Sequence, residues 1–130
     1  MNNLEELARI SDAEWYVMQV LWESSDVLTS NQIIEKLIDK HDWKPKTIQT
    51  LIGRLVKKKA VGFKEMGRTY QYYPLVTKES CIRAESKSFL QRAFGGAIKP
   101  MFLHFLEEQN LSTQEIDELK KILNERSDKR

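Results

Sequence analysis

The stretch DWKPKTIQTLIGRLVKKKAV, residues 42–61, combines an apolar and a basic face in one predicted helix. Five apolar residues recur at i, i+3, i+4, i+7 and i+8, the spacing of a single helix face: Ile48, Leu51, Ile52, Leu55 and Val56. Pro45 suits the first turn, because the amide hydrogen that proline lacks would have no partner there. At about 100° per residue, the opposite face carries Lys46, Thr50, Gly53, Arg54 and Lys57. We therefore predict a helix that buries one face and exposes a row of cations.

Two more helices are predicted upstream, each opened by a capping box. Ser11 pairs with Glu14 in the first box, and Thr29 pairs with Gln32 in the second. Apolar residues then recur at helical spacing behind each cap. Three short helices therefore form the first part of the chain.

A β-hairpin is predicted directly after the lysine run. Residues from about 61 to 65 and from about 69 to 73 are rich in aromatic and β-branched side chains, with Gly67 at the turn and Pro74 at the end. The aromatic side chains allow two interpretations, packing on the helices or a stacking platform for single strands, and packing is favoured: Phe63, Tyr70, Tyr72 and Tyr73. Three helices followed by a hairpin are the order of a winged helix-turn-helix domain.

The residue pattern changes at Thr77, and the segment that follows predicts three further helices. The first is capped by Thr77 and ends at Gly95-Gly96, the second contains Pro100 near its start, and the third runs from Ser112 to about Arg126. About 50 residues are too few to bury these apolar faces alone, so a homodimer interface is expected here. Its predicted residues are Ile82, Phe89, Ile98, Met101, Phe102, Phe105, Leu106, Ile116, Leu119 and Leu123.

The predicted fold class is mainly α with a small β-hairpin, divided into two domains. Residues 1–76 are expected to form a winged-helix domain, for which the charges described next indicate DNA binding, and residues 77–130 a three-helix dimerisation domain.

Charge is distributed unevenly along the chain, although the net charge is only +2. Residues 1–39 contain two basic and eight acidic residues, whereas residues 40–70 contain nine basic and two acidic ones. A cation cluster inside a nearly neutral protein indicates a polyanionic partner at one face.

The exposed row of the predicted helix has the chemistry that DNA recognition requires. Arg54 can donate to guanine O6 and N7, Thr50 can hydrogen-bond a base or touch a thymine methyl, and Lys46 and Lys57 can bind phosphate. The hairpin adds two expected contacts to phosphate or the minor groove, Lys64 and Arg68. Either a close backbone approach or a neighbouring aromatic ring would explain Gly53.

The last two residues of the lysine run have a different expected role. Lys57, Lys58 and Lys59 point in different directions on a helix, so they cannot all face DNA. Lys58 and Lys59 are interpreted as solubilising residues or as capping cations at the helix C-terminus.

Other function classes lack support in the sequence. No nucleotide-binding, metalloprotease or serine-hydrolase motif occurs, so an enzyme is not expected. Cys81 is the single cysteine, and His41 and His104 lack metal-ligand spacing, so neither a metal nor a cofactor is predicted. No apolar segment could insert into a membrane and MNNLEELARI does not resemble a signal peptide, so a cytoplasmic location is expected.

Four segments carry a resemblance to a known family: ISDAEWYVMQVLW, WKPKTIQTLIGRLVKKKAV, RTYQYYPLV and FLHFLEEQNLS. Together they resemble the BlaI/MecI family of penicillinase and methicillin-resistance repressors, which also includes CopY-type regulators. The resemblance implies a dimeric winged-helix repressor of resistance genes that binds palindromic operators of TACA/TGTA type. It assigns DNA contacts to Lys46, Thr47, Thr50, Arg54 and Arg68.

The sequence departs from the family pattern at three places. The β-lactam branch is cut by a membrane sensor protease at an Asn-Phe bond, where this chain has His104-Phe105. The copper branch has a cysteine-rich tail, whereas this chain ends in NERSDKR. Lys44 replaces the small capping residue before the proline, which weakens the cap and adds a candidate phosphate contact.

Two alternatives to a DNA-binding repressor are also defined. One is a CopY-like metal-responsive repressor, supported only by Cys81 and two distant histidines. The other is a winged-helix adaptor that binds protein and not DNA. Salt dependence separates the adaptor from a DNA-binding protein, because phosphate contacts weaken steeply as salt rises.

Overall fold

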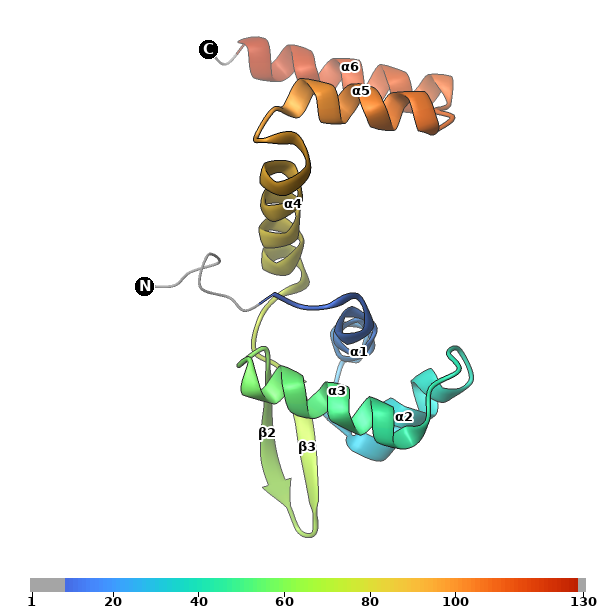
Figure 1. The fold of residues 1–130 in the computed structure, drawn as a ribbon, viewed down its shortest axis with the longest axis vertical. Helices are drawn as coiled ribbons and strands as arrows, with labels where there is room; N and C mark the ends of the chain where they lie inside the picture. The colour runs from blue at the N-terminus through green and yellow to red at the C-terminus, as the bar shows by residue number, and fades with distance from the viewer. Residues whose placement is uncertain (1–8, 129–130) are drawn as a thin grey trace. The chain divides into compact units, whose positions relative to one another are not determined.

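The computed structural model describes residues 9–128, which form two compact units (Figure 1). The first unit extends to Lys87 and the second begins at Ser88. The predicted boundary at residues 76 and 77 precedes a helix that continues through residue 87, and it stays a prediction. Residues 1–8 and 129–130, the outer ends of the two predicted domains, lie outside the described part, as does most of the start MNNLEELARI.

Three helices form the centre of the first unit, as predicted: α1 (Asp12–Glu23), α2 (Ser30–Ile38) and α3 (Pro45–Lys57). Both capping boxes are present. The Ser11 hydroxyl accepts from the Glu14 amide at 3.2 Å, while the Glu14 carboxylate accepts from the Ser11 amide at 2.8 Å. Thr29 and Gln32 exchange the same two bonds. These side chains satisfy amides at the helix start that have no partner within the helix.

A single apolar core joins the three helices and the start of the hairpin. The predicted face of α3 lies in it, with Ile48 and Leu55 fully buried and Leu51 and Ile52 at most 4% exposed. The facing side chains come mainly from α1 and α2, and include Val17, Met18, Leu21, Ile33 and Leu37. Burial of this stripe fixes which side of α3 faces outward.

The hairpin belongs to a three-stranded antiparallel sheet with the order β1-β3-β2. Strands β2 (Val61–Met66) and β3 (Thr69–Pro74) match the predicted hairpin, with Gly67 at a φ of +66° in the turn. The sequence did not predict β1 (Leu28–Thr29), which pairs with Tyr72 and Gln71 of β3. A strand of two residues, one of which caps the next helix, is too short to show an alternating pattern in the sequence. It is recognised only from its pairing with β3.

The sheet is attached to the helices at its base. The Leu75 amide donates to the Ala60 carbonyl at 2.8 Å and closes the base of the hairpin, while the Trp22 indole of α1 donates to the Val76 carbonyl at 2.9 Å. Val61 is 1% exposed, whereas the side chains become exposed toward the turn. The hairpin therefore has a fixed base and a solvated tip.

Three further helices follow, near the predicted positions: α4 (Lys78–Phe94), α5 (Ile98–Glu108) and α6 (Thr113–Asp128). Gly95 and Gly96 have φ values of +60° and +89° and end α4 by donating to its last turn. The Ser112 and Glu115 capping box opens α6. No described residue of α5 or α6 is buried, and Cys81 is the buried residue of α4.

The end of α3 places a lysine where glycine is usual. Lys59 has a φ of +67°, its amide donates to the Val56 carbonyl, and the Ala60 amide donates to the Leu55 carbonyl, both at 3.0 Å. This is a Schellman motif, whose left-handed residue is normally glycine because a β-carbon is strained there. The structure therefore gives Lys59 a specific backbone role that the general expectation of a capping or solubilising cation did not include.

Replacing Lys59 with glycine should relieve this strain. We expect Lys59→Gly to raise the free energy of unfolding by about 1 kcal/mol. Urea denaturation followed by circular dichroism measures the change. Lys59→Ala is the matched control, since it removes the same charge but keeps the β-carbon, and a similar gain in both variants would contradict the explanation.

Candidate nucleic-acid interface

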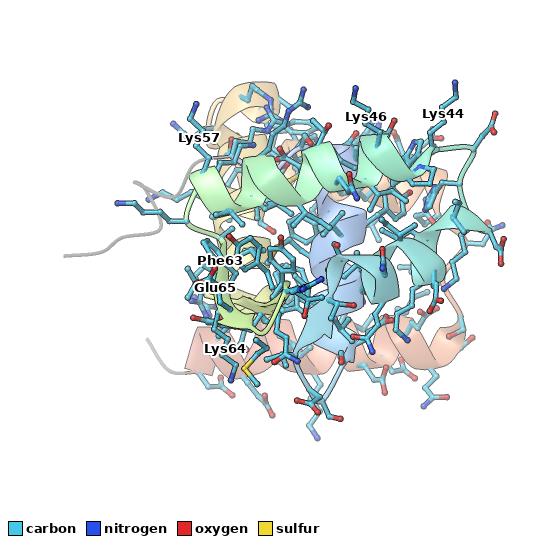
Figure 2. All side chains as sticks on the ribbon, turned by 90° about the horizontal axis from the view of Figure 1, so that it is seen from below. Lys44, Lys46, Lys57, Phe63, Lys64 and Glu65 are labelled. Atoms are coloured by element: carbon cyan, nitrogen blue, oxygen red, sulfur yellow. The ribbon has the colours of Figure 1, made fainter. Side chains whose placement is uncertain are left out.

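The outer face of α3 is a continuous row of exposed polar side chains. Every residue predicted to contact DNA from this region is exposed: Lys44, Lys46, Thr47, Thr50, Arg54 and Lys57. Figure 2 shows Lys44, Lys46 and Lys57 extending from the same side of the helix, away from the core. The segment Pro45–Lys57 contains four cations if Lys44 is added, and no acidic residue. The face therefore presents positive charge without an opposing carboxylate on the same helix.

The start of α3 is held by backbone and not by a side-chain cap. Lys44 occupies the cap position and makes no side-chain capping bond, because an ammonium group cannot accept from an amide. Its carbonyl accepts from the Thr47 amide at 2.9 Å, and Pro45 has no amide hydrogen to satisfy. The Lys44 side chain is thus left to extend into solvent beside the helix start.

Thr50 has a more restricted role than the sequence indicated. Its hydroxyl donates to the Lys46 carbonyl at 3.0 Å, one turn earlier in the same helix. With its hydrogen engaged, the hydroxyl can only accept from a ligand, and the side-chain methyl group is the other surface that it offers. Thr50 therefore contributes an acceptor and an apolar contact in the middle of a cationic row.

The hairpin of β2 and β3, which is the wing of the winged-helix fold, places its two predicted contacts differently. Lys64 pairs across the hairpin with Gln71, and Phe63 and Glu65 alternate with it on the other face. Figure 2 shows Phe63 and Glu65 on the side of the hairpin toward α3 and Lys64 on the opposite side. Arg68 lies in the two-residue turn at the tip and is exposed. Lys64 and the outer face of α3 are therefore not brought together, while Arg68 is free to reach beyond the tip.

The aromatic side chains of the hairpin divide between core and surface. Tyr72 packs against the core, as favoured from sequence. Phe63 and Tyr70 are 44% and 45% exposed and contact each other, with ring centroids 4.9 Å apart. Tyr73 lies over Gly62, where a β-carbon would come within 2.8 Å of its ring. Packing on the helices thus describes the base of the hairpin but not its outer half.

The middle lysine of the run forms a partly buried ion pair that the sequence did not reveal. The Lys58 ammonium lies 2.5 Å from Glu14 Oε1 and donates to the Arg9 carbonyl at 2.6 Å. Glu14 is 1% exposed, since the same carboxylate completes the cap of α1. Residues 14 and 58 are far apart in sequence, so only the packing of α1 against the end of α3 creates the pair. The expectation that Lys58 only solubilises or caps the helix was incomplete for this reason.

The environment of Glu14 favours its charged form. Burial by itself raises the pKa, but hydrogen bonds from Lys58 and Ser11 and the charge of Lys58 outweigh it, and the pKa of Glu14 lies below its ordinary value of 4.5. The cationic end of α3 is thereby neutralised on its inner side only.

An aromatic cluster precedes α3. His41 stacks on Trp43 with centroids 4.3 Å apart and an interplanar angle of 12°, and Tyr16 of α1 lies 4.3 Å from His41. Trp43 also packs against the core. The cluster therefore fixes the loop that leads to Lys44, a role for His41 that the sequence did not indicate.

No metal or membrane site accompanies this face in residues 9–128. Within them, no three His, Cys, Asp or Glu side chains lie close enough to hold a metal ion. Cys81 is buried, which raises the pKa of its thiol. None of the described helices is long and apolar enough to cross a bilayer.

Sequence comparison relates most of the chain to known repressors. A family profile described as penicillinase repressor matches residues 10–125. A penicillinase repressor of Bacillus licheniformis is 40% identical over 127 residues, 98% of either chain. The methicillin resistance regulatory protein MecI of Staphylococcus aureus (strain N315) is 40% identical over 117 residues, which cover 90% of this chain and 94% of MecI.

Solved structures resemble the fold as well. The DNA-binding domain of the repressor BlaI has a TM-score of 0.53 and 38% identity, covering 62% of this chain and 93% of that one. The monomeric form of Bacillus licheniformis BlaI in complex with the blaP half-operator has a TM-score of 0.50 and 39% identity, covering 57% and 89%. These similarities confirm the predicted winged-helix fold class.

Removing the ammonium partner of Glu14 should destabilise the protein. We expect Lys58→Met to lower the free energy of unfolding at about pH 7 by about 1 to 3 kcal/mol, because it leaves a buried carboxylate without its cation. The folded pKa of Glu14 is below the unfolded one, so the unfolded state binds more protons at acidic pH. The stabilisation is therefore present above pH 4.5 and lost as the pH falls through the folded pKa.

Urea denaturation at several pH values measures this loss. Lys57→Met is the matched control, because it removes the same charge from an exposed position and should change the unfolding free energy by no more than about 0.5 kcal/mol. Equal losses in the two variants, or a Lys58→Met loss that persists in acid, would refute a stabilising pair.

Proposed function

The chain belongs to the penicillinase repressor family, and on that premise we propose that it is a sequence-specific DNA-binding repressor that acts as a dimer. The observation that carries the proposal is the outer face of α3, where exposed cations and a threonine stand directly behind the buried stripe. A helix that is held in place by its buried face and presents a basic face to solvent is suited to the major groove of double-stranded DNA.

Each side chain of the row has a separate proposed task. Arg54 recognises a guanine through its two acceptors, and Thr47 and Thr50 contact neighbouring base edges. Lys44, Lys46 and Lys57 bind phosphates on either side of the groove. The wing follows the duplex outside the groove, with Arg68 at its tip as the contact to backbone or minor groove. Lys64 stays a proposed phosphate contact, made from the opposite side of the hairpin.

The proposed dimer uses the helices after the wing. Many of their apolar side chains are exposed in the single chain, including Ile98 at 63%, Leu123 at 54% and Phe105 at 44%. Single chains rarely leave so many large apolar side chains in water, whereas a second copy can bury them. Two recognition helices related by a two-fold axis then match a palindromic operator, which the family resemblance gives as TACA/TGTA type.

Release from the operator is proposed to involve proteolysis. The resemblance points to a membrane sensor protease, and the bond that corresponds to its cleavage site joins His104 and Phe105. Both residues lie in α5 and are exposed. A repressor of this kind acts where the chromosome lies, so a cytoplasmic location is part of the proposal.

Replacing Arg54 should separate base recognition from phosphate binding. We expect Arg54→Ala to weaken operator binding by about 1 to 3 kcal/mol and to relax preference at one base position. Gel-shift titrations against the operator and against scrambled duplex measure both effects. Lys57→Ala removes the same charge from the same helix, and should weaken both duplexes equally and lower the salt slope by about one unit. If Arg54→Ala bound the operator as well as wild type, the outer face of α3 would be excluded as the surface that reads the bases. If the affinity did not change with salt, a protein-binding adaptor would be favoured.

A charge introduced among the exposed apolar residues should disrupt the dimer. We expect Leu123→Asp to shift the protein toward monomer and to weaken operator binding at least tenfold, because burying an unpaired carboxylate at an interface is unfavourable. Analytical ultracentrifugation and gel-shift titration measure the two effects. Asn124→Asp adds the same charge to the next residue, which is also exposed, and serves as the control. A Leu123→Asp protein that stays dimeric would place the interface elsewhere.

A further inference from the structure

Gly53 lies on the exposed face of α3, although glycine weakens a helix interior. Nothing in the described fold requires it there. Apart from its two chain neighbours and the backbone of its own helix, a β-carbon at this position would meet no atom within 4 Å, so an aromatic neighbour is excluded as the explanation. Gly62 is different, since its β-carbon would overlap the Tyr73 ring. The reason for Gly53 must therefore lie outside the folded chain.

Because it lacks a side chain, the exposed Gly53 leaves a gap in the row of exposed side chains, which we call the recess. Thr50 precedes it by three residues and Lys57 follows it by four, so both lie next to it on the same helix face. The Thr50 hydroxyl donates to the Lys46 carbonyl, so the methyl group is the part of Thr50 that is left to contact an apolar ligand. The helix spacing therefore borders the recess with a threonine on one side and a lysine on the other.

We propose that this recess receives the C5-methyl edge of a thymine in the operator, which makes Gly53 a specificity-determining residue. Thymine is the base that presents a methyl group in the major groove, and it sits beside acceptor groups that lysine and arginine can bind. A phosphate would instead be attracted to the ends of the lysine side chains. The inference rests on the proposed DNA-binding function and adds a base identity at the position facing Gly53.

The first experiment replaces single thymines by deoxyuridine, which lacks only the methyl group. The wild-type full chain selects a duplex from a random DNA library, and copies of this duplex carry one deoxyuridine each. We expect one position in each half-site to weaken binding by about fourfold, the effect of one methyl group removed from an apolar contact. The remaining positions should change affinity much less.

The second experiment adds a β-carbon through Gly53→Ala. The variant should unfold at a higher temperature than wild type, because alanine favours the helix and meets no obstacle in the fold. It should nevertheless bind the selected duplex about tenfold more weakly, the penalty of a mismatched base pair. On the duplex with deoxyuridine at the sensitive position, the variant should lose no further affinity and should bind at least as well, since the new carbon takes the place of the methyl group.

Lys57→Ala is the matched control on the same face. It should weaken binding to the thymine and deoxyuridine duplexes by the same factor, because a phosphate contact does not depend on the base. The sign of the deoxyuridine effect therefore distinguishes a recess for the methyl group from a general loss of affinity.

The outcomes separate this inference from the proposed function. If the wild-type chain selects no DNA, the proposed function fails and the inference falls with it. If the wild type selects a duplex but Gly53→Ala binds it equally well, the close approach at Gly53 is refuted alone. If deoxyuridine weakens both proteins by the same factor at every position, the assignment to a thymine methyl is refuted.

Discussion

The arrangement of this protein depends on the burial of one side of α3. Ile48 and Leu55 are fully buried, and contacts with α1 and α2 prevent the helix from turning about its axis. Since residues on the two faces are linked by the same backbone, burying the apolar stripe also fixes Lys46, Thr50, Arg54 and Lys57 on the outside. The proposed recognition surface is thus a direct consequence of core packing and needs no separate support.

The lysine run at the end of α3 shows how position gives identical residues different roles. Lys57 is exposed on the outer face, Lys58 pairs with buried Glu14, and Lys59 takes the left-handed conformation that ends the helix. The ion pair joins the start of α1 to the end of α3, so the capping carboxylate serves two helices. Local sequence could separate Lys57 from its neighbours by angle, but it contained no signal for the partner 44 positions away.

For the three helices after the wing, the sequence predicts the helices themselves, but the single chain does not show what their apolar faces contact. Their positions and caps follow from the chain, as the Ser112 and Glu115 box illustrates. Their apolar side chains, including Ile98 and Leu123, stay exposed within one chain. Short amphipathic helices cannot bury wide apolar faces against so few residues, which is why a second copy is the proposed partner. What covers these apolar side chains therefore cannot be read from the contacts within one chain.

Local sequence patterns were enough to predict the helices, their capping boxes, the hairpin with Gly67 and the exposed row of α3, because each depends on residues close together in the chain. Only the folded chain revealed the β1 strand, the pair of Glu14 with Lys58 and the stack of Tyr16, His41 and Trp43. It also separated the two explanations of Gly53, by showing open space where an aromatic ring had been an alternative. Contacts between distant segments form only when the core brings them together, so no local pattern encodes them.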